Sequence, residues 1–187
     1  VFCKKQKVLD LASGEGAVSE FLQTLGCEVI ALDISKEALL KVKKRGIKTV
    51  LGSVEEKLPF ENETFDAVFW GDNVEHLFMP QKTLKEIKRI LKKKGKLIIS
   101  TPNMGYWRYR LHFLFKGMIP QTEWYGKNSW EWEHIRFFNK NIINDFIKSE
   151  GFLFNNFYGV SRRRLDKLFM NLFPEIFGMI MVVEVTK

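Results

Sequence analysis

Short apolar segments alternate with amphipathic segments along most of this chain. The apolar segments have strand character and end at turn residues, whereas the amphipathic segments carry apolar side chains at helical spacing. The predicted strands are residues 8–11, 29–32, 48–51, 65–70, 96–100, 152–158 and 178–186, and the predicted helices are residues 17–25, 35–45, 79–93 and 140–150. This alternation is typical of parallel α/β units.

Two details of this pattern concern helix ends and a late apolar stripe. Gly95 and Gly151 are expected to stop the helices at 79–93 and 140–150.

Between the last two strands, apolar residues follow helical spacing at Leu165, Leu168, Phe169, Leu172 and Phe173. We expect this stripe to pack in the core rather than to anchor the chain to a membrane.

Residues 101–139 break the alternation. They hold four of the five tryptophans, namely Trp107, Trp124, Trp130 and Trp132. A stretch of this length without a clear period is usually a lid or a binding loop. It follows the strand at 96–100, at the sheet edge where α/β folds bind ligands. The sequence therefore predicts one domain, residues 1–187, with an aromatic lid and acceptor-binding segment at 101–139.

Composition narrows the class of protein. The chain has 187 residues, of which 45% are apolar and 28% charged, as in an ordinary globular domain. Its longest apolar run, residues 176–183, is too short to cross a bilayer. Cys3 and Cys27 lack metal-ligand spacing, so we expect no metal site. With no secretory signal visible, we expect a cytoplasmic protein.

The net charge of +8 raises the question of an anionic partner. Most of the lysines lie on predicted helices, where solvated faces and helix ends account for them. Only Arg162–Arg164 forms a compact cluster, which suits either an anionic substrate, a membrane surface or simple exposure to solvent. The charge alone does not favour a nucleic-acid partner, and the sequence leaves the oligomeric state open.

The most informative segment is a glycine-rich turn after the first predicted strand. The strand 8–11 contains Asp10 near its end, and Gly14 and Gly16 follow before an amphipathic helix begins. Asp33 ends the next strand, at about the distance from the turn at which an acid binds ribose hydroxyls. Together they predict a nucleoside-containing cofactor across the first two strands.

The residues of the turn distinguish between two cofactor classes. A dinucleotide-binding turn needs a third glycine, but Ser19 stands at that position. Asp10 and Glu15 would both repel a pyrophosphate, which disfavours a nicotinamide dehydrogenase. The same acids suit a cofactor with a positively charged sulfur and an amino group.

At this point the chain resembles the class I S-adenosylmethionine-dependent methyltransferases, whose first motif reads acid-x-Gly-x-Gly-x-Gly. Ala12 replaces the first glycine of that motif. The resemblance implies a Rossmann-like fold of seven strands in the order 3-2-1-4-5-7-6, with strand seven antiparallel. It also implies S-adenosylmethionine as the cofactor and S-adenosylhomocysteine as the product.

The resemblance assigns cofactor contacts to particular positions. Small residues in the turn allow the backbone to approach the cofactor, Asp33 binds the ribose and Ile34 covers the adenine. Ser53 stands where the family usually has the aspartate that contacts the adenine amino group, and Leu58-Pro59-Phe60 follows as expected. The implied cofactor-binding residues are Asp10, Ala12, Ser13, Gly14, Gly16, Asp33, Ile34, Ser53, Val54 and Gly71.

Candidate proton acceptors follow the fourth predicted strand. A base is needed only when the acceptor atom carries a proton, and Glu75 and His76 are the candidates, with His76 as the predicted catalytic residue. The alternative is that His76 forms hydrogen bonds within the fold. The Asn/Asp-Pro-Pro-Tyr motif of enzymes that methylate nucleobase amines is absent from the sequence, which disfavours that class.

Residues 101–151 resemble a narrower subgroup, on the segments Thr101-Pro102-Asn103, Tyr106–Leu111 and His134–Phe138. The subgroup includes the methionine-biosynthesis protein MetW and methyltransferases found beside polysaccharide and glycan enzymes. Trp107, Arg110, His134 and Arg136 are then the predicted acceptor-binding residues, which suit a small-molecule or glycan-type acceptor. The alternative is that the two arginines pair with Glu123 or Glu133.

Two other functions remain open from the sequence. An accessory protein would bind the cofactor and act through a partner enzyme, as the resemblance to MetW allows. An RNA methyltransferase would bind RNA with an affinity that falls steeply with salt.

Overall fold

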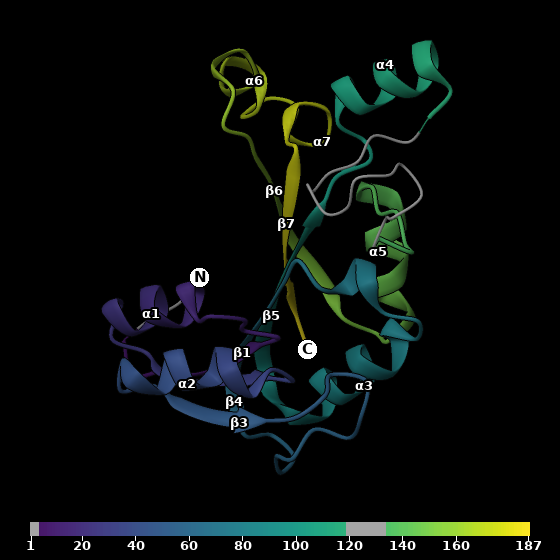
Figure 1. Ribbon diagram of the computed structural model, residues 1–187. Coiled ribbons are helices and arrows are strands. Elements are labelled where there is room, and N and C mark those ends of the chain that lie inside the picture. The colour runs from purple at the N-terminus through teal and green to yellow at the C-terminus, as the bar shows by residue number, and fades with distance from the viewer. Residues whose placement is uncertain (1–3, 119–133) are drawn as a thin grey trace.

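A computed structural model describes residues 4–118 and 134–187 and contains one seven-stranded sheet in the order β3-β2-β1-β4-β5-β7-β6 (Figure 1). The strands are β1 (Lys7–Leu11), β2 (Glu28–Asp33), β3 (Lys48–Leu51), β4 (Phe65–Gly71), β5 (Leu91–Pro102), β6 (Leu153–Val160) and β7 (Ile180–Thr186). The first five pair in parallel, and β7 is antiparallel to both β5 and β6. The predicted fold class and strand order are therefore confirmed.

Helices cover both faces of this sheet. They are α1 (Ala17–Thr24), α2 (Lys36–Lys44), α3 (Pro80–Ile90), α4 (Trp107–Lys116), α5 (Lys140–Ser149), α6 (Arg164–Phe169) and α7 (Pro174–Phe177), with the short 3-10 helix η1 (Val74–His76). Side chains alternate along the strands, so Val8 packs with α1 and α2, whereas Leu9 packs with α3 and α5. The two apolar clusters place the core on both sides of the sheet.

The boundary between α3 and β5 differs from the prediction. The helix ends at Ile90 rather than near Lys93, and β5 begins at Leu91. Leu91 is fully buried and pairs with Phe65 of β4, which holds it in an extended conformation. Lys94 then takes a left-handed conformation with φ of 61° before Gly95. Strand pairing, rather than the glycine, ends this helix.

The prediction that the apolar stripe 165–173 packs in the core is wrong. Its five apolar residues are 42–72% exposed. The helix α6 has six residues and turns Asp166, which is 1% exposed, toward the protein instead of a leucine. The spacing therefore does mark a helix over Arg164–Phe169, but the residue that this helix buries is the polar Asp166.

The predicted lid is described only in part. Residues 119–133, with Trp124, Trp130 and Trp132, lie outside the described residues, as do Cys3, Glu123 and Glu133. The described part contains α4, which has no buried residue, and a bridge between Asn103 and Phe138. No helix within residues 4–118 and 134–187 is long and apolar enough to span a membrane.

Candidate functional site

The loops that follow β1, β2 and β4 meet at one edge of the sheet. Leu11 of β1 pairs with Leu32 of β2 and with Trp70 of β4, so the carboxyl ends of all three strands lie together. A cavity of about 180 Å³ opens at this edge. It is lined by Ala12, Asp33, Ile34, Gly52, Ser53, Val54, Glu55, Asn73 and Leu77.

The glycine-rich turn is held against β2 by its backbone. The Ser13 N–H donates to the Leu32 carbonyl at 3.0 Å, and the Gly14 N–H donates to Asp33 Oδ2 at 2.8 Å. Ala12 takes a left-handed conformation with φ of 58°, where the family motif has glycine. This alanine therefore strains a turn that its hydrogen bonds nevertheless fix.

Asp33 has the capacity that a ribose-binding acid needs. Its Oδ2 accepts from Gly14 and its Oδ1 accepts from the Ser35 N–H at 2.8 Å. A carboxylate offers about four lone-pair sites, so each oxygen can accept one more hydrogen bond, as from a pair of hydroxyls. The adjacent Ile34 is 75% exposed and borders the same cavity. These residues fit the nucleoside part of the expected cofactor.

Asp10 lies beneath the turn rather than in the cavity lining. It is 2% exposed, and Ser19 Oγ donates to its Oδ2 at 2.5 Å. Burial raises the pKa of Asp10 to about 6, although hydrogen bonds from Ser19 oppose this rise and the Asp33 charge adds to it. Its negative charge would lie under a bound cation without direct exposure to it.

Two predicted glycines have packing roles. A Cβ atom on Gly16 would lie 2.6 Å from Val42 Cγ2, and a Cβ atom on Gly71 would lie 2.4 Å from the ring of Phe69. Gly16 thus lets the start of α1 lie against Val42 of α2, and Gly71 leaves room for the ring of Phe69 on the same strand, β4. Neither lines the cavity, so their contact with a cofactor stays a prediction, as it does for Ser13 and Gly14.

Four residues of this cavity were not among the predicted cofactor contacts: Gly52 and Glu55, which flank Ser53 and Val54, and Asn73 and Leu77. Asn73 and Leu77 line it from the segment after β4, and Trp70 Nε1 donates to Asn73 Oδ1 at 2.9 Å. Because β4 is the parallel neighbour of β1, its carboxyl end must face the glycine-rich turn. That position, rather than any motif, was the signal that could have found them.

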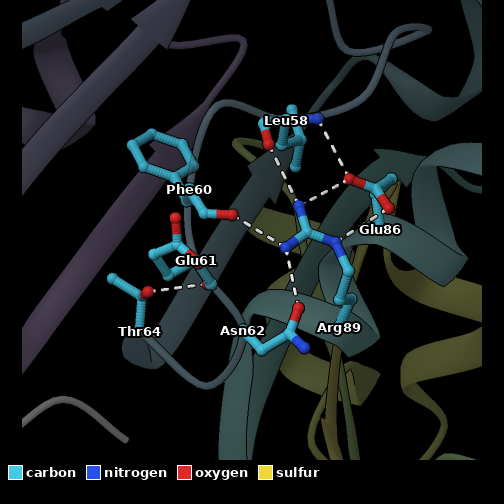
Figure 2. Close-up of polar contacts among 7 residues, drawn as sticks. All are labelled: Leu58, Phe60, Glu61, Asn62, Thr64, Glu86 and Arg89. Carbon is cyan, nitrogen blue, oxygen red and sulfur yellow. Dashed lines mark hydrogen bonds and ion pairs between the residues drawn. The ribbon is translucent and has the colours of Figure 1, made fainter.

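Arg89 of α3 fixes the loop that carries Ser53 and Val54 (Figure 2). All five of its N–H groups are used: two reach both carboxylate oxygens of Glu86, at 2.7 and 3.0 Å, and one reaches Asn62 Oδ1 at 3.0 Å. The other two donate to the carbonyls of Leu58 and Phe60, at 3.0 and 2.7 Å. The Leu58 N–H in turn donates to Glu86. One side chain thus closes the loop onto the helix.

A cluster of acid and imidazole groups lies beside the cavity. Glu75, His76 and His134 each offer an atom within 4.8 Å of the others, and the His76 and His134 ring centroids are 4.7 Å apart. Glu75 is 1% exposed and accepts a hydrogen bond from Thr101 Oγ1 at 3.0 Å. Such a cluster can accept and hold a proton at the sheet edge.

Asp72 adds a fourth ionisable group near this cluster. Burial raises its pKa, while the hydrogen bond from Ser100 Oγ, at 3.0 Å, and the nearby His76 lower it. The Asp72 carboxyl therefore interacts electrostatically with the nearby His76.

The four predicted acceptor-binding residues are not brought together. Trp107 and Arg110 border two different pockets around α4 and α7, and Arg136 borders a third beside α5. The Arg136 guanidinium donates to the carbonyls of Leu77, at 2.9 Å, and Phe78. Only His134 lies beside His76. The resemblance of residues 101–151 to a subgroup and the binding roles of these side chains stay predictions.

Comparison with known proteins shows that this chain is similar in sequence to methyltransferases. Residues 9–99 match the family model described as "Methyltransferase domain". The chain is 38% identical over 109 residues to the demethylmenaquinone methyltransferase of Renibacterium salmoninarum, which covers 55% of this chain and 45% of that protein. It is 29% identical over 154 residues to the mitochondrial ubiquinone biosynthesis O-methyltransferase of Homo sapiens, which covers 78% of this chain and 41% of that protein.

A solved structure supports the fold over the whole chain. The S-adenosylmethionine-dependent methyltransferase from Mesorhizobium loti superposes with a TM-score of 0.71 at 15% identity, covering 100% of this chain and 93% of that chain. The chain spans about half the length of the curated relatives that it matches, namely 45% and 41% of the two named above.

Proposed function

We propose that this chain, whose residues 9–99 match the methyltransferase domain family, transfers the methyl group of S-adenosylmethionine to a hydroxyl group of a small molecule. The observation that carries the proposal is Asp33, a fixed carboxylate with spare acceptor capacity beside an exposed Ile34. The two relatives named above are enzymes, and the human one is named an O-methyltransferase. Their names support a small-molecule acceptor over a glycan and catalysis over an accessory role.

The residues of the cavity divide the work of holding the cofactor. Asp33 accepts hydrogen bonds from the two ribose hydroxyls, Ile34 covers one face of the adenine, and the Ser53 hydroxyl contacts its edge. Asp10 contributes a negative charge beneath the turn, which favours a cationic group above it. When bound, the cofactor supplies an electrophilic methyl group on a positively charged sulfur.

His76 is the base in this proposal. It belongs to the segment whose residues Asn73 and Leu77 border the cavity, and it offers a ligand atom within 4.8 Å of one on the buried Glu75. Its imidazole takes the proton of the acceptor hydroxyl as the oxygen becomes the nucleophile. The neighbouring carboxylates of Asp72 and Glu75 stabilise the imidazolium that results.

The Asp33→Ala variant tests the cofactor assignment. We expect it to bind S-adenosylhomocysteine more weakly by about 1.5–3 kcal/mol, because two hydrogen bonds to a charged group are lost. Isothermal titration calorimetry of S-adenosylhomocysteine measures this difference. Asp145→Ala on α5, an exposed acid, is the matched control and should bind like the wild type.

Since Asp33 also accepts two backbone hydrogen bonds, Asp33→Asn is measured beside it with thermal unfolding of all variants. Wild-type affinity in a folded Asp33→Ala variant would exclude the ribose contact. Absence of heat with S-adenosylhomocysteine, together with binding of a nicotinamide dinucleotide, would overturn the proposed function itself.

The His76→Gln variant tests the base. Release of S-adenosylhomocysteine with a hydroquinone as the probe acceptor should fall by a factor of about 10²–10⁴, the usual contribution of general-base catalysis. His112→Gln on α4, an exposed histidine, should keep the wild-type rate. An unchanged rate in a folded His76→Gln variant would show that His76 is not the base.

A further inference from the structure

Helices α4 and α6 lie at the same end of the molecule, away from α1, α2 and α3 (Figure 1). Asp166 of α6 joins them: it accepts hydrogen bonds from Tyr106 Oη at 2.6 Å and Trp107 Nε1 at 3.0 Å, at the start of α4. Ser161 Oγ, at the end of β6, donates to the same carboxylate at 2.5 Å. The outer surfaces of both helices are therefore held as parts of one platform.

The outer surface of this platform is rich in large apolar side chains. On and after α4 the exposed ones are Leu111, Phe113, Leu114, Phe115 and Met118, which are 42–76% exposed. On and after α6 they are Leu165, Leu168, Phe169, Leu172 and Phe173, which are 42–72% exposed. Ten such residues at one end are far more than isolated surface apolar residues explain.

The exposed charges on the two described segments, residues 104–118 and 162–173, are all positive. Residues 104–118 contain no aspartate or glutamate but include the exposed Arg108, Arg110 and Lys116. Arg162, Arg163 and Arg164 are exposed beside the α6 leucines. The acid within this second segment, Asp166, is buried and occupied by its three donors. We call residues 107–118 and 162–173 together the basic apolar end.

We propose that the basic apolar end docks the protein on an anionic lipid bilayer surface. Apolar side chains enter the boundary between headgroups and acyl chains while arginines above them bind lipid phosphates, as in interfacial helices. A second copy of this chain fits the surface less well, because a symmetric dimer would bring two positively charged surfaces together. The short helices also protrude, which suits shallow insertion rather than a groove for a partner.

Sedimentation with lipid vesicles tests the proposal. The wild type should sediment with vesicles of phosphatidylcholine that contain about 30% of the anionic lipid phosphatidylglycerol. It should remain in solution with vesicles of phosphatidylcholine alone. Arg162→Gln and Arg164→Gln should each weaken binding about fivefold, since each basic residue near an anionic surface is worth about one kcal/mol. The double variant Leu168→Glu/Leu172→Glu should weaken it about tenfold or more, because its apolar contribution is lost.

The matched control is Leu40→Glu on α2, which is 52% exposed and far from this end. It should bind vesicles like the wild type, and calorimetry with S-adenosylhomocysteine should show that all variants remain folded. Failure of the wild type to bind anionic vesicles, or equal binding by Leu168→Glu/Leu172→Glu, would overturn the proposal. Light scattering would also overturn the proposal if the wild type were a dimer and the double variant a monomer, since these residues would then form a protein interface.

Discussion

Replacement of Arg89 by alanine is expected to lower the free energy of unfolding by about 3–4 kcal/mol, because five hydrogen bonds, four of them partly buried, are lost together. The Glu86 carboxylate, 21% exposed in its side chain, is left without its bidentate partner. The loop of residues 52–64 keeps only the hydrogen bonds of Val54 to Thr83 and of Leu58 to Glu86 as side-chain attachments to α3, so in our proposal affinity for S-adenosylhomocysteine should fall as well.

Urea unfolding followed by circular dichroism measures the effect of Arg89→Ala. Arg89→Lys should restore little of the lost stability, since an ammonium group cannot reach the carboxylate and the loop carbonyls in one plane. Lys48→Ala removes an exposed ion pair with Glu28 and should cost less than about 1 kcal/mol. If Arg89→Ala unfolded at the same urea concentration as Lys48→Ala, the loop would not depend on this side chain.

Replacement of Asp10 by asparagine is expected to raise the free energy of unfolding by about 3 kcal/mol at pH 8. Burial raises the pKa of this carboxyl from 3.8 to about 6, despite the Ser19 hydrogen bonds that lower it. That difference, at about 1.4 kcal/mol for each pH unit, is the cost of keeping the buried group ionised. Asparagine keeps the shape and an oxygen for Ser19 without the charge.

The stability gain of Asp10→Asn should depend on pH, because it comes from the ionisation of the buried Asp10 carboxyl. Below pH 3.8 the Asp10 carboxyl is protonated in both the folded and unfolded chain, so the variant should gain almost nothing there. Between about 4 and about 6 the unfolded chain ionises first, and the wild type loses stability relative to the variant. Above that range the gain should be constant. A gain that did not depend on pH would contradict the buried-charge explanation.

Asp10→Asn should also weaken binding of the cationic cofactor, in our proposal, because the negative charge beneath the turn is removed. Stability and binding would then respond to this one residue in opposite directions, which is common where a buried charge is retained for function. Calorimetry with S-adenosylmethionine and S-adenosylhomocysteine separates the two effects, since only the first carries the positive sulfur.

Part of the predicted cofactor set could be located from the sequence because its residues lie within short motifs after neighbouring parallel strands. Five of the ten predicted residues line one cavity, namely Ala12, Asp33, Ile34, Ser53 and Val54. Their contact with a cofactor stays a prediction. Strand periodicity gave the elements, whereas the strand order came from the family resemblance.

The acceptor side could not be predicted in the same way. His134 lies beside His76 although 58 positions separate them, and the Ile135 and Arg136 N–H groups both donate to the Glu75 carbonyl. No periodicity or spacing encodes such a contact. The Arg136 guanidinium donates to the carbonyls of Leu77 and Phe78, partners that chemical type alone does not reveal, and its predicted contact with an acceptor stays a prediction.

The hydrogen bonds from Gly14 and Ser35 to Asp33 have a consequence for selectivity. In our proposal Asp33 binds the ribose of the cofactor, and these hydrogen bonds would orient both carboxylate oxygens before the nucleoside binds, so little reorganisation would be needed on association. A carboxylate held in this way cannot shift to compensate for a missing hydrogen-bond donor. A sugar that lacks its 2′-hydroxyl would leave one oxygen desolvated and unmatched, and the pocket would discriminate against deoxynucleosides without any steric barrier.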